Sequence, residues 1–198
     1  MSEIDAPIGP GTLVLVVGPS GAGKDSLIGY ARQALGDRPD LAFARRVVTR
    51  TADTALEDHD TLSPAEFAVL AESGAFALHW QAHGLAYALP RSIDDVIAAG
   101  GSVVANVSRA AVEAARRRYG RVVVVQVTAP RAVLAARLAQ RGRETAAAVE
   151  ARLSRSAEMQ LNGAVELDNS GPLARAGEAF VALLAGLQAA ADGVDRCG

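Results

Sequence analysis

Short apolar segments separated by longer amphipathic ones form the main pattern of the chain. Residues 12–17 (TLVLVV) are apolar and β-branched and predict a buried strand, and the runs at 102–107 (SVVANV) and 122–127 (VVVVQV) have the same character. Weaker extended patterns occur at 42–49 (AFARRVVT) and near 164–168. Strands that read as continuous apolar runs are typical of a parallel sheet that is covered on both faces.

Amphipathic segments between these runs predict helices at about 24–35, 63–74, 92–100, 109–119, 130–141, 145–160 and 172–191. The clearest start is Ser63-Pro64-Ala65-Glu66, where a capping serine precedes proline at the first helical position and glutamate follows three residues after the cap. We expect Ser92 to cap the next helix. The alternation predicts an α/β fold, a parallel sheet flanked by helices.

Segment 50–90 fits the alternation less well, because it is rich in loop residues and shows one helix and short extended pieces. We interpret it as an insertion that closes over a site. A chain of 198 residues is long enough to bury a substantial core unaided. We therefore predict a single domain over residues 1–198 that carries this insertion.

Composition narrows the class of protein. Half of the residues are hydrophobic and 21% are charged, which argues against a disordered chain. A net charge of −2 gives no broad attraction for nucleic acid. No apolar run approaches the ~20 residues that cross a bilayer. The N-terminus carries acids where a signal peptide carries bases, and the single cysteine, Cys197, allows no disulfide framework. We expect a cytoplasmic protein without nucleic-acid or membrane partners.

The segment GPSGAGKD, Gly18 to Asp25, follows the first strand and opens the first helix. Gly-x-x-x-x-Gly-Lys in that context is typical of a phosphate-binding loop, or P-loop, whose backbone N–H groups and helix N-terminus bind phosphate oxygens. Lys24 is the only lysine among 20 basic residues, which a turn that merely starts a helix would not explain. We predict that ATP is bound by Gly18, Pro19, Ser20, Gly21, Ala22, Gly23, Lys24, Asp25 and Ser26.

Asp25 stands where this motif usually has Ser or Thr, whose hydroxyl binds Mg²⁺. A carboxylate beside ATP phosphates is repulsive unless a cation lies between them. We expect Asp25 to contact the metal, directly or through water, with Ser26 as the alternative ligand. The strand end SVVANVSR offers Asn106 and Ser108 but lacks the acid usually found there, so Asp25 is interpreted as a relocated carboxylate.

Arginines crowd segment 137–155 (RLAQRGRETAAAVEARLSR). Helical spacing pairs Arg137 with Arg141 on one face and Arg152 with Arg155 on another, with Arg143 in the turn between. A solvated face paired with glutamates is one reading. After a P-loop, a lid that neutralises transferring phosphate is favoured, so we predict catalytic roles for Lys24, Arg137, Arg141, Arg143 and Arg152.

Histidine chemistry is not indicated, because His59, His79 and His83 lack metal-ligand spacing and no Ser-His-Asp or Cys-His set appears. His59 either is structural or faces the acceptor from the acidic loop EDHD. A phosphate acceptor needs no general base, since its second pKa of about 6 leaves it largely ionised at neutral pH. This favours a nucleotide or sugar phosphate over an alcohol.

Four segments together resemble the guanylate kinase family over about residues 11–185: GPSGAGKD, VVTR, HGLAY and RLAQRGRE. The resemblance implies a core, an acceptor-binding insertion and a lid. It also implies that Thr49, Arg50 and Tyr87 bind the acceptor phosphate and that Asn169 lies beside the adenine of ATP.

Departures from that family point to a different acceptor. Arg46 replaces a serine that reads guanine, Asp53 replaces a phosphate-binding arginine, and Asp25 replaces the metal-binding serine. An acceptor with no base but with another anionic group fits this pattern. Arg46 and Arg50 share one side of their predicted strand about 13 Å apart, so both could hold phosphates of one sugar.

Three short segments resemble a narrower family, the ribose 1,5-bisphosphate phosphokinases of phosphonate degradation: GKDSL (23–27), NVSRA (106–110) and RGRE (141–144). This implies transfer of the γ-phosphoryl of ATP, with Mg²⁺, to the 1-phosphate of ribose 1,5-bisphosphate, giving 5-phosphoribosyl 1-diphosphate. Two alternatives are a guanylate kinase acting on GMP and an inactive guanylate-kinase-like binding module. Arg46 disfavours the first, and the intact Gly18, Gly23 and Lys24 disfavour the second.

Overall fold

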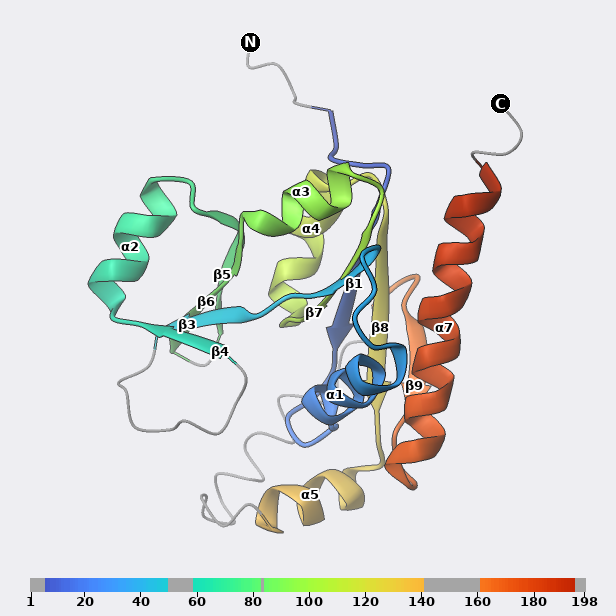
Figure 1. Cartoon of the computed structure of the whole chain (residues 1–198). Coiled ribbons are helices and arrows are strands. Elements are labelled where there is room, and N and C mark those ends of the chain that lie inside the picture. The colour runs from blue at the N-terminus through green and yellow to red at the C-terminus, as the bar shows by residue number, and fades with distance from the viewer. Residues whose placement is uncertain (1–5, 50–58, 83, 141–160, 195–198) are drawn as a thin grey trace. The chain divides into compact units, whose positions relative to one another are not determined.

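The computed structural model describes residues 6–49, 59–82, 84–140 and 161–194 (Figure 1). The chain divides into two compact units. The first contains Met1–Leu15 and Arg38–Val123, and the second contains Val16–Asp37 and Val124–Gly198.

A five-stranded sheet has the order β2-β7-β1-β8-β9. Its strands are β1 (Thr12–Val17), β2 (Leu41–Phe43), β7 (Ser102–Asn106), β8 (Val122–Thr128) and β9 (Val165–Asp168). β2 runs parallel to β7, and β8 runs parallel to β9. Every residue of β1 and β7 is buried, which explains why their sequences are continuously apolar rather than alternating. The predicted α/β fold is confirmed.

The second unit contains the helices α1 (Lys24–Leu35), α5 (Arg131–Gln140) and α7 (Leu173–Val194). α1 and α7 lie side by side (Figure 1). Their contact needs a glycine, because a Cβ on Gly177 of α7 would lie 2.5 Å from the Tyr30 ring of α1. Residues Ala176, Phe180 and Leu184 of α7 recur every four positions and are buried, so α7 presents one apolar face to the unit.

The first unit contains a second sheet of order β4-β3-β6-β5, from β3 (Arg46–Thr49), β4 (His59–Leu62), β5 (Phe76–Ala82) and β6 (Leu85–Pro90). Helix α2 (Pro64–Glu72) packs on one face of it (Figure 1). Val47, Phe67 and Ala88 form a small core there. The capping box expected from Ser63 and Glu66 is present, with both reciprocal hydrogen bonds formed.

Two predictions for this unit were wrong. The strand expected at 42–49 is two strands in different sheets, because β2 ends at Phe43 and the Ala44 N–H donates to Val104 of β7. In segment 50–90 the expected helix and extended pieces are present, as α2 and as the strands β4, β5 and β6 of the second sheet. Ser92 does not cap its helix: it is the first residue of α3 (Ser92–Ala98), and Arg91 occupies the cap position. The helix predicted at 145–160 lies outside the described residues.

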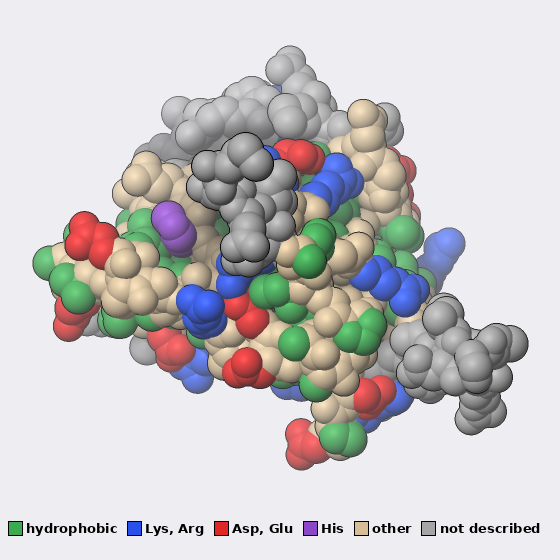
Figure 2. Space-filling model, turned by 90° about the horizontal axis from the view of Figure 1, so that it is seen from above, with side chains coloured by type: hydrophobic (Ala, Val, Ile, Leu, Met, Phe, Trp, Pro, Cys, Tyr) green, Lys and Arg blue, Asp and Glu red, His purple; other side chains and the backbone are tan. Residues whose placement is uncertain are grey.

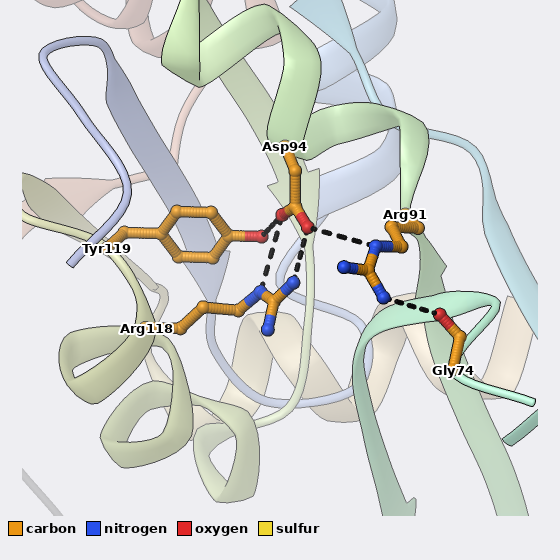
Figure 3. Close-up of polar contacts among 5 residues, drawn as sticks. All are labelled: Gly74, Arg91, Asp94, Arg118 and Tyr119. Carbon is orange, nitrogen blue, oxygen red and sulfur yellow. Dashed lines mark hydrogen bonds and ion pairs between the residues drawn. The ribbon is translucent and has the colours of Figure 1, made fainter. Parts of the chain in front are cut away.

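A buried carboxylate joins three parts of the first unit (Figure 3). Asp94, in the first turn of α3, is 8% exposed and accepts hydrogen bonds from Arg118 and from the Tyr119 hydroxyl, the latter at 2.7 Å. Arg118 ends α4 (Val112–Arg118), which follows the short helix η1 (Arg109–Ala111). Arg91 lies 4.0 Å from Asp94 and also donates to the Gly74 carbonyl, after α2. The Asp94 cluster therefore connects α3, the end of α4 and the turn before β5.

Candidate active site

The P-loop has the backbone that its sequence predicts. Gly18 and Gly23 have φ of 146° and 87°, which side chains rarely tolerate. A Cβ on Gly18 would lie 2.4 Å from the Val127 carbonyl oxygen of β8, and one on Gly23 would lie 2.5 Å from Asn169 Nδ2. Glycine is therefore required at both positions, by conformation and by space.

Lys24 is the first residue of α1, and its side chain returns over the loop. Nζ donates to the carbonyl oxygens of Gly18 at 2.9 Å and Pro19 at 3.1 Å. The ammonium thus lies at the concave side of a loop whose helix N-terminus carries partial positive charge. This arrangement concentrates positive charge where a phosphate chain would bind.

Asn169 follows β9 and supports the loop from another strand. It is 2% exposed, its backbone N–H donates to Thr128 of β8, and its Nδ2 donates to the Ala22 carbonyl oxygen at 2.7 Å. Among the described residues, its Oδ1 has no hydrogen-bond partner. Asn169 therefore holds the P-loop in position, while its predicted place beside adenine stays a prediction.

Helix α5 lies next to the P-loop, since the Cβ position of Gly21 would be 3.2 Å from Leu138 Cγ and 3.3 Å from the Leu134 carbonyl oxygen. Arg137, half-buried on this helix, has a buried Nη1 with no hydrogen-bond partner within the described part of the chain. The predicted catalytic residues Arg141, Arg143 and Arg152 lie outside the described residues. Among the predicted lid arginines, Arg137 is thus the one within the described residues, and it lies on the helix that contacts the P-loop.

Asp25 and Ser26 lie in the first turn of α1, and both are exposed. A carboxylate at a helix N-terminus is favourable by itself, so Asp25 also stabilises α1. No group of three or more His, Cys, Asp or Glu residues that could hold a metal occurs among the described residues.

Three of the predicted acceptor residues, Arg46, Thr49 and Tyr87, lie in the four-stranded sheet of the first unit. Val48 pairs with Tyr87, Tyr87 pairs with Trp80, and Arg46 pairs with His59, so these residues share one face of the sheet. Val47 points to the opposite face, against α2. The face without α2, which we call the acceptor face, therefore carries Arg46, His59, Tyr87 and Trp80.

Thr49 does not belong to the acceptor face. Strand alternation places it beside Val47, and it is 8% exposed. Its hydroxyl accepts a hydrogen bond from the Ala86 N–H at 2.8 Å and donates to the Ala86 carbonyl oxygen at 3.4 Å. Thr49 thus fastens β3 to β6, and the structure does not bring it together with Arg46 and Tyr87. Arg50 lies outside the described residues.

Sequence reasoning missed Trp80. Its ring stacks on Tyr87 with 5.7 Å between centroids and 9° between planes. It is the only tryptophan of the chain, in a segment with little other strand signal, and that rarity was the available clue. The strand end that we examined for an acid carries Asn106, which is 5% exposed, and Ser108, whose buried hydroxyl has no hydrogen-bond partner among the described residues.

Basic and acidic side chains are interspersed on the face drawn in Figure 2 rather than gathered by sign. No helix within the described ranges is both long and apolar enough to cross a membrane.

Comparisons with known proteins identify similar sequences and folds. A family model described as an AAA domain matches residues 13–162. A ribose 1,5-bisphosphate phosphokinase PhnN from Chelativorans sp. (strain BNC1) is 50% identical over 186 residues, covering 92% of this chain and 89% of that protein. One from Rhodopseudomonas palustris is 57% identical over 149 residues, covering 75% and 76%.

Solved structures share the fold at lower identity. A guanylate kinase from Anaplasma phagocytophilum aligns with a TM-score of 0.61 and 18% identity over 90% of this chain and 86% of that one. A gluconokinase from Sinorhizobium meliloti aligns with a TM-score of 0.51 and 21% identity over 96% and 97%. Both are kinases by name, and at these identities they establish the fold alone.

Proposed function

The chain belongs to the ribose 1,5-bisphosphate phosphokinase family, and from this premise we propose that it transfers the γ-phosphoryl of ATP to the 1-phosphate of ribose 1,5-bisphosphate. The products are then 5-phosphoribosyl 1-diphosphate and ADP. The observation that carries the proposal is identity of about half of all residues over most of both chains, with the P-loop intact.

The residues of the second unit fit ATP. Backbone N–H groups of the loop and Lys24 Nζ are donors suited to phosphate oxygens. Lys24 would exchange its Gly18 and Pro19 carbonyl partners for oxygens of the terminal phosphates. Arg137 Nη1 and Asn169 Oδ1 are buried polar atoms without protein partners among the described residues, and such atoms usually have one.

Magnesium fits the same region through Asp25, or Ser26, together with phosphate oxygens, and when bound it neutralises charge on the β- and γ-phosphates. Both side chains are exposed at the loop end of α1, where they can bind a metal ion that ATP also binds. Asp25 would hold the metal, and the bound cation would offset the repulsion between the Asp25 carboxylate and the ATP phosphates.

The transfer needs few protein groups. An oxygen of the acceptor's 1-phosphate forms a bond to the γ-phosphorus, the bond from that phosphorus to the β-phosphate oxygen breaks, and ADP leaves. The attacking oxygen is already ionised near neutral pH, because the second pKa of a phosphate monoester is about 6, so no proton has to be removed by a base. Lys24, Arg137 and the predicted lid arginines stabilise the charge on the transferring group.

The acceptor face accounts for a substrate with two phosphates and no base. Arg46 and Tyr87 lie on the same face of the sheet. Trp80, on the edge strand β5, stacks on Tyr87. Arg46 supplies a cation to a second anionic group, which GMP lacks. A site that provides buried polar partners rejects a ligand without them more strongly than an apolar pocket does.

The test is ADP formation by the purified chain with ATP and Mg²⁺ and either ribose 1,5-bisphosphate, GMP or no acceptor. We expect turnover with the sugar bisphosphate, formation of a diphosphate resonance in the ³¹P NMR spectrum, and at most trace activity with GMP. Equal turnover of GMP and the sugar bisphosphate would refute the assigned acceptor, and absence of any turnover would refute the kinase assignment.

A further inference from the structure

Trp80 has an unusual environment for a buried tryptophan. The residue is 7% exposed, yet its Nε1–H has no hydrogen-bond partner among the described residues. Buried tryptophan N–H groups usually find an acceptor, because leaving a donor unpaired away from water is unfavourable. An indole N–H is a donor only, so the group that completes this environment must supply an acceptor atom.

The position of Trp80 identifies the kind of group. Trp80 pairs across β5 and β6 with Tyr87, which pairs in turn with Val48 of β3, so the three side chains point to the acceptor face. Arg46 precedes Val48 by two residues and points the same way. The opposite face is filled by α2. Trp80 Nε1–H therefore belongs to the side of the sheet that carries a cation and a phenol.

The aromatic stack gives Trp80 a second role. With 9° between planes and 5.7 Å between centroids, the indole lies parallel to the Tyr87 ring and restricts its rotation. A phenol held in one orientation directs its hydroxyl at one point, which lowers the entropy cost of binding. Phosphate oxygens are the acceptors that Arg46, Tyr87 and an indole N–H can share, since all three supply donors.

We propose that Trp80 is an acceptor-binding residue: its Nε1–H donates to a phosphate oxygen of the sugar bisphosphate, and its ring holds Tyr87 in the binding orientation. This inference rests on the proposed function. It distinguishes Trp80 from a tryptophan that only fills the sheet, for which a phenylalanine of similar shape would serve equally well.

The first experiment compares wild type with Trp80→Phe, which keeps an aromatic ring against Tyr87 and removes the N–H. We expect KM for ribose 1,5-bisphosphate to rise about 10- to 100-fold, the factor for losing one hydrogen bond to a charged group, with KM for ATP unchanged. Phe67→Leu, on the α2 side of the same sheet, is the matched control. It should lower thermal stability and leave both KM values as in wild type.

The second experiment needs no variant. Since Trp80 is the only tryptophan, its emission reports on this position alone. Titration of wild type with ribose 1,5-bisphosphate, without ATP, should change the emission and saturate. Inorganic phosphate should produce the change only at much higher concentration, because it offers one anionic group. If Trp80→Phe does not fold, as judged by circular dichroism, this titration of wild type decides whether Trp80 contacts the acceptor.

Failures of the two proposals differ in the wild-type protein. If wild type phosphorylates ribose 1,5-bisphosphate but Trp80→Phe folds and keeps its KM, the inference about Trp80 is wrong and the function stands. An emission spectrum that does not change at saturating ribose 1,5-bisphosphate would also show that the inference about Trp80 is wrong. If wild type does not phosphorylate the sugar bisphosphate at all, the function fails and the inference fails with it.

Discussion

Removing the carboxylate of Asp94 should destabilise the fold far more than removing an exposed acid. In Asp94→Ala, the Tyr119 hydroxyl, on a residue that is 2% exposed, loses its 2.7 Å partner. Such a stranded hydroxyl costs about 1–3 kcal/mol. Arg118 loses its ion pair as well, and breaking a buried pair by removing one partner costs about 3–5 kcal/mol. The Arg118 side chain is 30% exposed, so water recovers part of that.

We therefore expect a loss of about 3 kcal/mol in the free energy of unfolding, below the sum of the two effects because Arg118 keeps some hydration. Urea unfolding followed by circular dichroism measures it. Asp40→Ala is the matched control, since Asp40 also accepts two hydrogen bonds from one arginine, Arg38, but with both side chains about 40% exposed. That exposed pair should be worth below about 1 kcal/mol.

A double-mutant cycle separates the contributions. Tyr119→Phe alone should cost about 1 kcal/mol, since it leaves Asp94 bound to Arg118. The double variant should lose less stability than the sum of the two single variants, because Asp94→Ala and Tyr119→Phe remove the same hydrogen bond. The reasoning is refuted if Asp94→Ala and Asp40→Ala cost the same, or if the Asp94 and Tyr119 effects are additive.

Four further outcomes are expected. Burial, and next the hydrogen bond to Asp94, raise the pKa of Tyr119. The contribution of the neutral Tyr119 hydroxyl to the free energy of unfolding is therefore complete below its ordinary pKa of about 10. It is lost as pH rises above that value, by up to about 1.4 kcal/mol per pH unit. Urea unfolding of wild type and Tyr119→Phe at several alkaline pH values should show this difference in slope. Lys24→Ala should keep the circular dichroism spectrum and lower kcat by at least about 10²–10³-fold, and a normal kcat would exclude the P-loop role. Asp25→Asn should require more Mg²⁺ for half-maximal rate, and Asp25→Ser should be tolerated better than Asp25→Ala; identical magnesium titrations of all three and wild type would assign the contact elsewhere. Arg46→Ser should raise KM for ribose 1,5-bisphosphate without creating comparable activity on GMP, whereas efficient GMP phosphorylation by this variant would contradict the role of Arg46.

The parts of the fold that sequence predicted well are those with local causes. β1 and β7 are buried on both sides, so their continuous apolar sequences identified them. The helix after Ser63 has a capping box that only neighbouring residues form. The P-loop needs glycines at Gly18 and Gly23 for reasons visible in the backbone itself, and the motif made that requirement readable.

The parts that sequence missed depend on residues distant in the chain. β5 and β6 are half-buried and rich in alanine, so strand formation there comes from pairing with each other and with β3 rather than from local preference. Thr49 was placed in the acceptor site by the family resemblance, together with Arg50 and Tyr87, yet one residue of offset in a strand sends a side chain to the opposite face. The Asp94 cluster joins residues about 25 positions apart, which no local pattern indicates.

The hydrogen bond from Asn169 to Ala22 spans 147 residues of chain and has a consequence for biosynthesis. The loop that forms the ATP site is synthesised 147 residues before the amide that holds it. A nascent chain ending before β9 would carry the whole P-loop motif without the strand and the asparagine that fix its shape. Tight nucleotide binding should therefore arise only after Asn169 has been made, so ATP cannot stabilise the nascent chain before that point.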